Sequence, residues 1–340
     1  MKHICTVAIL LAGTAMAAPC NRICLESYVD RYMDALIRHD PKSLPLSPRL
    51  KNTENGQRLE PGDGFWRTAT AKGVYRLFVD DVDNGQVAFI GTMKEADIPV
   101  TVAIRLKIEN QQISEIETFV VRTGLGSGNG AAELDKMGMP SPVLLGLVSS
   151  VDRPSRDALI KTANVYFSGL EKNDGKGDYP FSDVCERLED GQRTTNNPDF
   201  NPNASPGGGG RGRGQAAPPP PPPSGFNPAA LGCLAQFKSG YYHFVTRIRD
   251  RRFVAVDPEL GLVFSFVFFD EATGKYRHYK MADGTEVANG PTRPWSWEIA
   301  EVFKIEKGKI RRVEAVLEQV PYGMMSGWSS WEEGMSSKPR

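Results

Sequence analysis

The sequence predicts an α+β protein with two tandem domains, each a curved antiparallel sheet packed on N-terminal helices. A helical pattern, a Glu-Asn/Asp-Gly turn and a Lys-Ile-Glu strand end each occur twice, in the same order. The paired segments are residues 25–36 and 159–170, 54–58 and 189–193, and 107–109 and 304–306. Such a repeat indicates a duplicated scaffold, so specialised function is expected where the two copies differ.

The first copy reads as a helix followed by strands. Apolar residues at helical spacing predict a helix over residues 23–38, which stops before Pro41 because the residue preceding a proline avoids the helical region. Residues 42–50 are expected to form a short helix or turn, and residues 52–59 a short strand and turn. Further strands are predicted at residues 75–81, 86–94, 100–109 and 113–122.

The second copy carries two insertions. Its helix is expected to begin at Pro154 or Ser155, since proline suits the first turn of a helix. Its strands are predicted at residues 241–249, 252–256, 262–270, 297–306 and 310–319. Residues 196–231 hold a glycine run and six consecutive prolines, a composition that cannot bury a core and predicts disorder. We interpret this stretch as a tolerated loop insertion rather than a ligand for a proline-binding partner. The insertion at residues 270–294 is expected to cover one mouth of the domain.

The sequence predicts an exported protein with two domains. Residues 1–18 have a basic start, an apolar stretch too short to span a bilayer and small residues before a cleavage point after Ala17, which predicts a signal peptide and a secreted or periplasmic protein. The domains are expected at residues 20–123 and 154–322, with a linker at 124–153 and a C-terminal tail at 323–340.

The composition argues against several partners. Lys plus Arg equals Asp plus Glu, at 41 each, so there is no electrostatic reason to expect nucleic acid or an anionic membrane. The mature histidines are scattered and no Cys-x-x-Cys pair occurs, so no metal site is predicted. No phosphate loop or nucleotide motif is found, and no cofactor is expected.

Four cysteines remain after removal of the signal: Cys20, Cys24, Cys185 and Cys233. They allow three connectivities of two disulfides. A bond between Cys185 and Cys233 would tie the ends of the disordered stretch and remove about 3–4 kcal/mol of unfolded-state entropy. That pairing leaves Cys20 with Cys24, which requires an irregular turn before the first helix.

The helix–strand order, the turn at residues 54–56 and the segment at 62–66 resemble nuclear-transport-factor-2-like (NTF2-like, SnoaL-like) domains. The mature chain as a whole resembles a family of secreted fungal and bacterial proteins with two such domains and no assigned function. Further points of resemblance are residues 185–191, 233–234, 251–257 and 303–311. The resemblance implies cone-shaped domains and an internal pseudo-dimer in which the two sheets face each other. It also supports the Cys185–Cys233 pairing, because the family carries cysteines at both positions.

Cones of this class often hold a pocket in which burial raises the pKa of a carboxylate and makes it a usable base. In the first copy, the candidate catalytic residues are Glu117, Arg105 and Asp63, and the candidate ligand-binding residues are Trp66 and Tyr75.

Glu117 recurs in the second copy as Glu314, which favours a shared structural role such as a cross-strand pair with Arg105. Arg105, in contrast, aligns with Val302, so a function confined to one copy is expected there.

Two classes of function remain open. The resemblance implies a protein that binds a small apolar or aromatic molecule, with or without cofactor-independent isomerase, dehydratase or hydrolase chemistry. The alternative is a non-catalytic structural or protein-interaction module whose pockets are filled by side chains.

Overall fold

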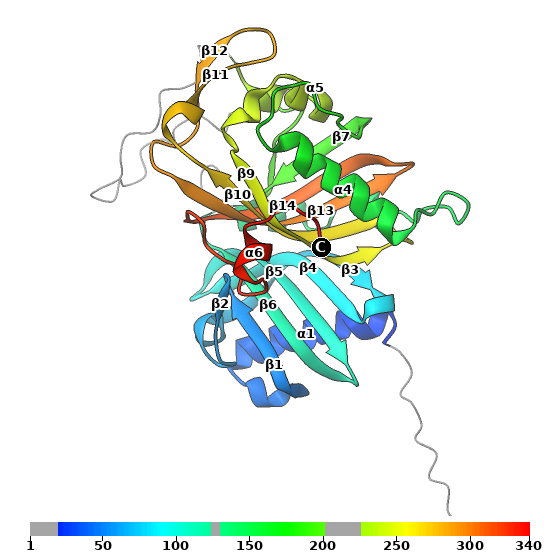
Figure 1. Cartoon of the computed structure of the whole chain (residues 1–340). Coiled ribbons are helices and arrows are strands. Elements are labelled where there is room, and N and C mark those ends of the chain that lie inside the picture. The colour runs from blue at the N-terminus through cyan, green and yellow to red at the C-terminus, as the bar shows by residue number, and fades with distance from the viewer. Residues whose placement is uncertain (1–19, 124–129, 201–225) are drawn as a thin grey trace, which may run out of the picture.

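Two six-stranded curved sheets form the framework of the chain (Figure 1). The computed structural model describes residues 20–123, 130–200 and 226–340. The helices are α1 (Arg22–Arg38), α2 (Gly130–Met137), α3 (Pro142–Leu145), α4 (Arg156–Leu170), α5 (Cys233–Lys238) and α6 (Trp331–Gly334). The strands of the first sheet are β1 (Leu46–Glu54), β2 (Gln57–Arg58), β3 (Ala69–Asp81), β4 (Gln86–Glu95), β5 (Ile98–Glu109) and β6 (Gln112–Val121). Those of the second are β7 (Phe181–Glu189), β8 (Gln192–Arg193), β9 (Arg247–Asp257), β10 (Leu262–Glu271), β13 (Trp295–Glu306) and β14 (Lys309–Pro321), while β11 (His278–Lys280) and β12 (Glu286–Ala288) form a separate hairpin.

The two sheets have the same strand order. The first runs β2-β1-β6-β5-β4-β3 and the second β8-β7-β14-β13-β10-β9. The predicted α+β class, with curved sheets packed on helices, is confirmed and is consistent with two tandem NTF2-like domains. One detail differs from the prediction, because β1 pairs with β6, and β7 with β14, in parallel.

Each sheet packs one face on its own helix, α1 in the first domain and α4 in the second (Figure 1). The predicted start of the second helix is confirmed, since Ser155 caps α4 by accepting a hydrogen bond from the backbone of Ala158 at 3.2 Å. Both expected disulfides are present, Cys20–Cys24 and Cys185–Cys233. The second joins β7 to α5 within the core of the second domain.

Several local predictions were wrong. Residues 46–50, expected in a short helix or turn, begin β1. Residues 247–257 form the single strand β9, where two strands at 241–249 and 252–256 were predicted. The predicted linker contains α2, whose Asp135 accepts hydrogen bonds from the backbone of β3. The insertion expected to be disordered over 196–231 is ordered at both ends, where the backbone of Asn196 donates to Leu231. The signal peptide and the proline run lie outside the described residues.

The opposite faces of the two sheets pack against each other and share one apolar cluster. The cluster draws on both domains: Tyr75, Leu77, Val79, Ala88, Ile90, Ala103, Phe119 and Val121 from the first, and Leu188, Ala255, Leu262, Phe264, Phe266, Ala300, Val302 and Val316 from the second. The molecule therefore has four layers, helix, sheet, sheet and helix (Figure 1).

The repeated glycine turns are also part of this contact. Gly56 and Gly191 both have positive φ, at 71° and 72°. A Cβ at Gly56 would lie 2.7 Å from the carbonyl oxygen of Met325, and one at Gly191 would lie 2.6 Å from that of Gly130. Each turn thus receives the chain that follows the last strand of the other domain, which explains why only glycine fits at both places.

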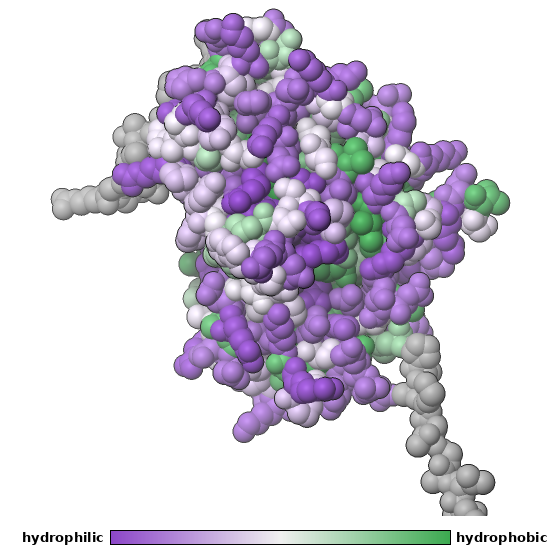
Figure 2. Space-filling view, viewed as in Figure 1, coloured by the Kyte–Doolittle hydropathy of each residue, from purple (hydrophilic) through white to green (hydrophobic). Residues whose placement is uncertain are grey.

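The visible surface is mainly hydrophilic, with small apolar patches (Figure 2). In the described part of the chain, no helix combines the length and the apolar character needed to cross a membrane.

Candidate functional site

Arg105 and Glu117 lie on the face of the first sheet that meets the second domain, and not in the first cone. They are cross-strand partners, and Arg105 Nε donates to Glu117 Oε2 at 3.0 Å. Because side chains alternate along β5, its residue Ile104 points into the cone and Arg105 points the other way. Arg252 of β9 donates to the same Glu117 carboxylate at 3.0 Å. The expected cross-strand pair of Glu117 with Arg105 is confirmed. The pair lies at the interface between the sheets rather than in the pocket suggested for the first cone.

The C-terminal tail covers this pair. The Trp328 ring lies 4.4 Å from the guanidinium of Arg105, and its indole nitrogen donates to Thr53 at 2.9 Å. Further along, the backbone of Arg340 pairs with β9 at Arg251 and Phe253. The tail thus closes one side of the boundary between the sheets.

The other candidates from the first copy are dispersed. Tyr75 belongs to the interface and donates its hydroxyl to Glu314 of the second domain. Trp66 is buried in the first cone, where its ring packs edge-on against Tyr32 at 5.4 Å. Asp63 is half exposed and pairs with Arg67 at 2.7 Å. The structure does not bring these residues together into a site.

A polar cluster does exist inside the second cone. Arg187 of β7 donates to Gln236 at 2.8 Å and to the Tyr242 hydroxyl at 3.0 Å, and it forms an ion pair with Glu189.

Glu301 of β13 lies in the same cone, hydrogen-bonded to the hydroxyl of Tyr166 from α4. The guanidinium of Arg187 lies 5.8 Å from the Tyr166 ring centre. Arg187, Glu301 and Tyr166 are at most 4 % exposed.

Two atoms of this cluster have no hydrogen-bond partner among the described residues, Arg187 Nε and Glu301 Oε2. Buried polar atoms are nearly always satisfied, so such atoms mark a place where a water or ligand is expected. Burial, with a smaller contribution from the nearby Glu189, raises the pKa of Glu301 to about 8 against the opposing effects of Arg187 and the Tyr166 hydrogen bond. Glu301 is therefore a neutral acid at pH 7, and the cluster as a whole carries no net charge.

The first cone lacks this cluster at the corresponding positions. Alignment of the repeats places Ile104 at the position of Glu301 and Asn52 at that of Arg187, whereas Tyr32 matches Tyr166. Tyr32 instead hydrogen-bonds Thr118 at 2.7 Å. Comparison of the copies residue by residue would have revealed both differences. To place Glu301 in the cone, one must also know which face of its strand points inward, because Glu301 and Val302 lie on opposite faces.

Aromatic rings surround the polar cluster. Tyr166 contacts Phe237 and Phe303, each with ring centres 5.1 Å apart. Phe181 packs on Phe237 at 4.8 Å. Tyr242 packs both on the core of this cone and on a small apolar cluster that includes Val287 of the β11–β12 hairpin, which has no counterpart in the first sheet. The covering role expected for the 270–294 insertion stays a prediction.

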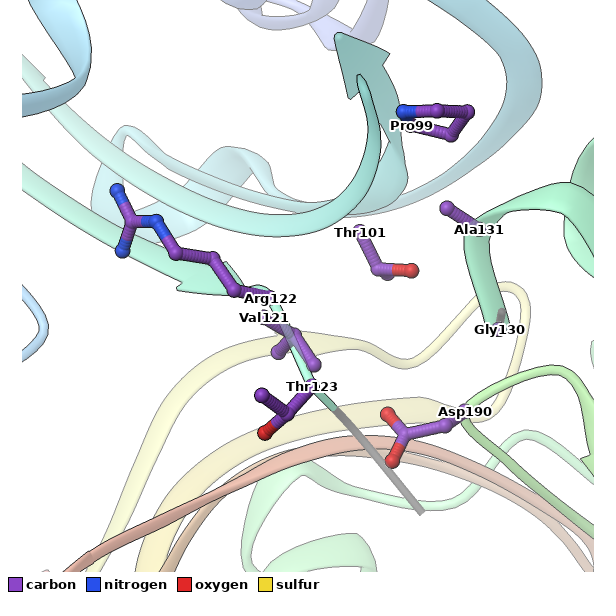
Figure 3. A pocket seen from close by; sticks show the side chains of 8 residues that line it. All are labelled: Pro99, Thr101, Val121, Arg122, Thr123, Gly130, Ala131 and Asp190. Atoms are coloured by element: carbon purple, nitrogen blue, oxygen red, sulfur yellow. The ribbon is translucent and has the colours of Figure 1, made fainter. Parts of the chain in front are cut away.

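A small hollow at the interface is a weaker candidate. It has a volume of about 10 Å³, room for a single water, and is lined by Thr101, Arg122, Thr123, Asp190 and neighbouring residues. The Arg122 side chain points away from Asp190 (Figure 3). No group of three or more potential metal ligands occurs in residues 20–123, 130–200 and 226–340.

Comparison with known proteins gives a partial match. A family described as a domain of unknown function (DUF8021) matches residues 152–317, the second domain. None of the curated proteins compared with the chain matches it.

Among solved structures, a protein of unknown function with a cystatin-like fold from Methylobium petroleophilum PM1 is 14% identical, with a TM-score of 0.26, over 30% of this chain and 78% of its own. An NTF2-like protein of unknown function from Cytophaga hutchinsonii ATCC 33406 is 8% identical, with a TM-score of 0.23, over 28% of this chain and 88% of its own. Scores this low add nothing to the topology described above.

Proposed function

We propose that this is an exported protein whose second cone binds a small apolar or aromatic molecule. The observation that carries the proposal is the pair of unpartnered buried atoms, Arg187 Nε and Glu301 Oε2, enclosed by aromatic rings. Buried polar groups are costly without partners. A ligand atom that forms hydrogen bonds with both of these atoms would remove this unfavourable free energy, and the surrounding rings would contact the apolar part of the ligand.

The two disulfides support export, since such bonds persist in oxidising compartments. The sheet-to-sheet cluster supports the further proposal that the chain is an internal pseudo-dimer, with the first domain as a scaffold. A neutral carboxylic acid next to a phenol can also donate a proton, so general-acid chemistry is available at Glu301.

The test is binding of three probes, ethylbenzene, acetophenone and benzoate, measured by calorimetry on the oxidised full-length mature chain. Wild type should bind at least one probe with a one-to-one stoichiometry. The double variant Arg187→Asn/Glu301→Ile, which carries the residues of the first copy, should lose that binding. Ile104→Val in the first cone is the matched control and should retain it. Circular dichroism establishes that each variant is folded.

The second candidate is a protein-interaction module with filled cones. It is favoured by the dense ring packing around Tyr166, which four phenylalanines contact. If wild type binds none of the three probes, the ligand-binding proposal is overturned in favour of this module.

A further inference from the structure

The unpartnered atoms of the second cone limit the chemistry of a ligand. Arg187 Nε carries a hydrogen and can only donate. Glu301 receives the phenol hydrogen of Tyr166 on one oxygen, and its Oε2 has no partner in the described residues. When the acid is neutral, Oε2 is free to carry its proton. Both free positions are therefore donors.

Two acceptor atoms of the cluster are already engaged. Gln236 Oε1 accepts from Arg187 and, at 3.3 Å, from Tyr242. Glu189 accepts from the Arg187 guanidinium. A ligand group that accepts hydrogen bonds supplies a partner for both free donors, whereas one that can only donate, such as an ammonium group, leaves both without a partner.

The charge balance excludes a second carboxylate. The groups facing Glu301 are Arg187 and Glu189 from β7, Tyr166 from α4 and, beyond the arginine, Tyr242. Arg187 is already neutralised by Glu189. An anionic ligand would bring an unbalanced charge into a fully buried site, which is strongly unfavourable.

We infer that the second cone takes a neutral, ring-bearing carbonyl compound, such as an aryl ketone or aldehyde, whose oxygen accepts hydrogen bonds from Glu301 and Arg187. The inference rests on the proposed function, because it names the ligand class of the same site. The ring of the ligand lies among Phe237, Phe303 and their neighbours, and the carbonyl oxygen satisfies the two donors.

The test compares dissociation constants of the three probes at pH 6.5. Acetophenone should bind at least about tenfold more tightly than ethylbenzene, which lacks the oxygen, and than benzoate, which carries the charge. If benzoate or ethylbenzene binds as tightly as acetophenone, the ligand class is wrong while the proposed binding function stands. If no probe binds, both are overturned.

A pH series separates the role of Glu301 from simple packing. Burial raises the pKa of Glu301 to about 8, so acetophenone affinity should be constant from pH 6 to about 8 and then fall about tenfold per pH unit. Glu301→Gln keeps a donor at the same place and should bind acetophenone with no such fall. Wild-type affinity that is unchanged up to pH 9.5 would contradict the inference.

Discussion

Arg22, the first residue of α1, donates to Asp257, the last residue of β9 in the other domain, at 3.0 Å. The equivalent Arg156, first residue of α4, donates to Asp81, the last residue of β3. The two contacts are reciprocal, as in the interface of a two-fold symmetric dimer. The repeat seen in the sequence is therefore accompanied by a repeat in the contacts between the domains.

Loss of either arginine should destabilise the protein. Asp257 and Asp81 have side chains only 1% exposed, so Arg22→Ala and Arg156→Ala each leave a buried carboxylate without its main cation. We expect a loss of about 1–3 kcal/mol in the free energy of unfolding for each, allowing for the partial exposure of both arginines. Urea denaturation measures this loss. Arg67→Ala, at an exposed pair, is the control and should cost less than about 0.5 kcal/mol. Equal effects of all three variants would refute the reciprocal contact as a source of stability.

Glu117→Gln tests whether the shared glutamate serves structure or ligand binding. Its carboxylate lies between Arg105 and Arg252, and removing a charge that two buried cations share should cost about 3–5 kcal/mol. Probe affinity should not change, because Glu117 lies outside both cones. Glu115→Gln, at a residue with its side chain 28% exposed, provides the milder comparison. A stable Glu117→Gln protein that no longer binds a probe would restore the catalytic hypothesis for this residue.

Stability should respond to pH through Glu298 and Glu301. Burial raises the pKa of each to about 8 from an ordinary 4.5. Between these values the unfolded chain is ionised and the folded chain is not, so the contribution of each group to stability is lost as pH rises through this window. Glu298→Gln and Glu301→Gln should each weaken this loss, by on the order of 1–3 kcal/mol between pH 5 and pH 8. Parallel urea titrations at the two pH values would show it, with the exposed Glu332→Gln as reference. Variants whose pH dependence matches wild type would count against neutral acids in the fold.

The two disulfides should differ in their contribution. Cys185 and Cys233 are 48 residues apart and Cys20 and Cys24 only 4, so the chain-entropy relation gives about 4 and about 2 kcal/mol respectively. Cys185→Ala/Cys233→Ala should accordingly lower the urea midpoint about twice as far as Cys20→Ala/Cys24→Ala. The reverse order would mean that native contacts around α1, and not loop closure, set the contribution.

The fold was more predictable than the site. Hydrophobic periodicity correctly indicated α1, α4 and the long strands, because local spacing alone determines which face is apolar. It missed α2 and the parallel pairing of β1 with β6, since both depend on contacts with distant residues.

The cluster in the second cone was missed because every candidate site residue was taken from the first copy. Glu117 is shared and lies in the interface, whereas Glu301 replaces an isoleucine and lies in a cone. The feature that indicated a site was Glu301, a charged residue on the otherwise apolar face of β13. This feature could be recognised only once the inward face of β13 was known.

The most direct measurement is a crystal structure of the oxidised protein with 4-bromoacetophenone, with the bromine located by its anomalous signal. We predict one strong bromine peak inside the second cone, among Phe181, Phe237 and Phe303, with the ketone oxygen within hydrogen-bond distance of Arg187 Nε and Glu301 Oε2. A bromine peak in the first cone or at the surface, with the second cone unchanged, would contradict it.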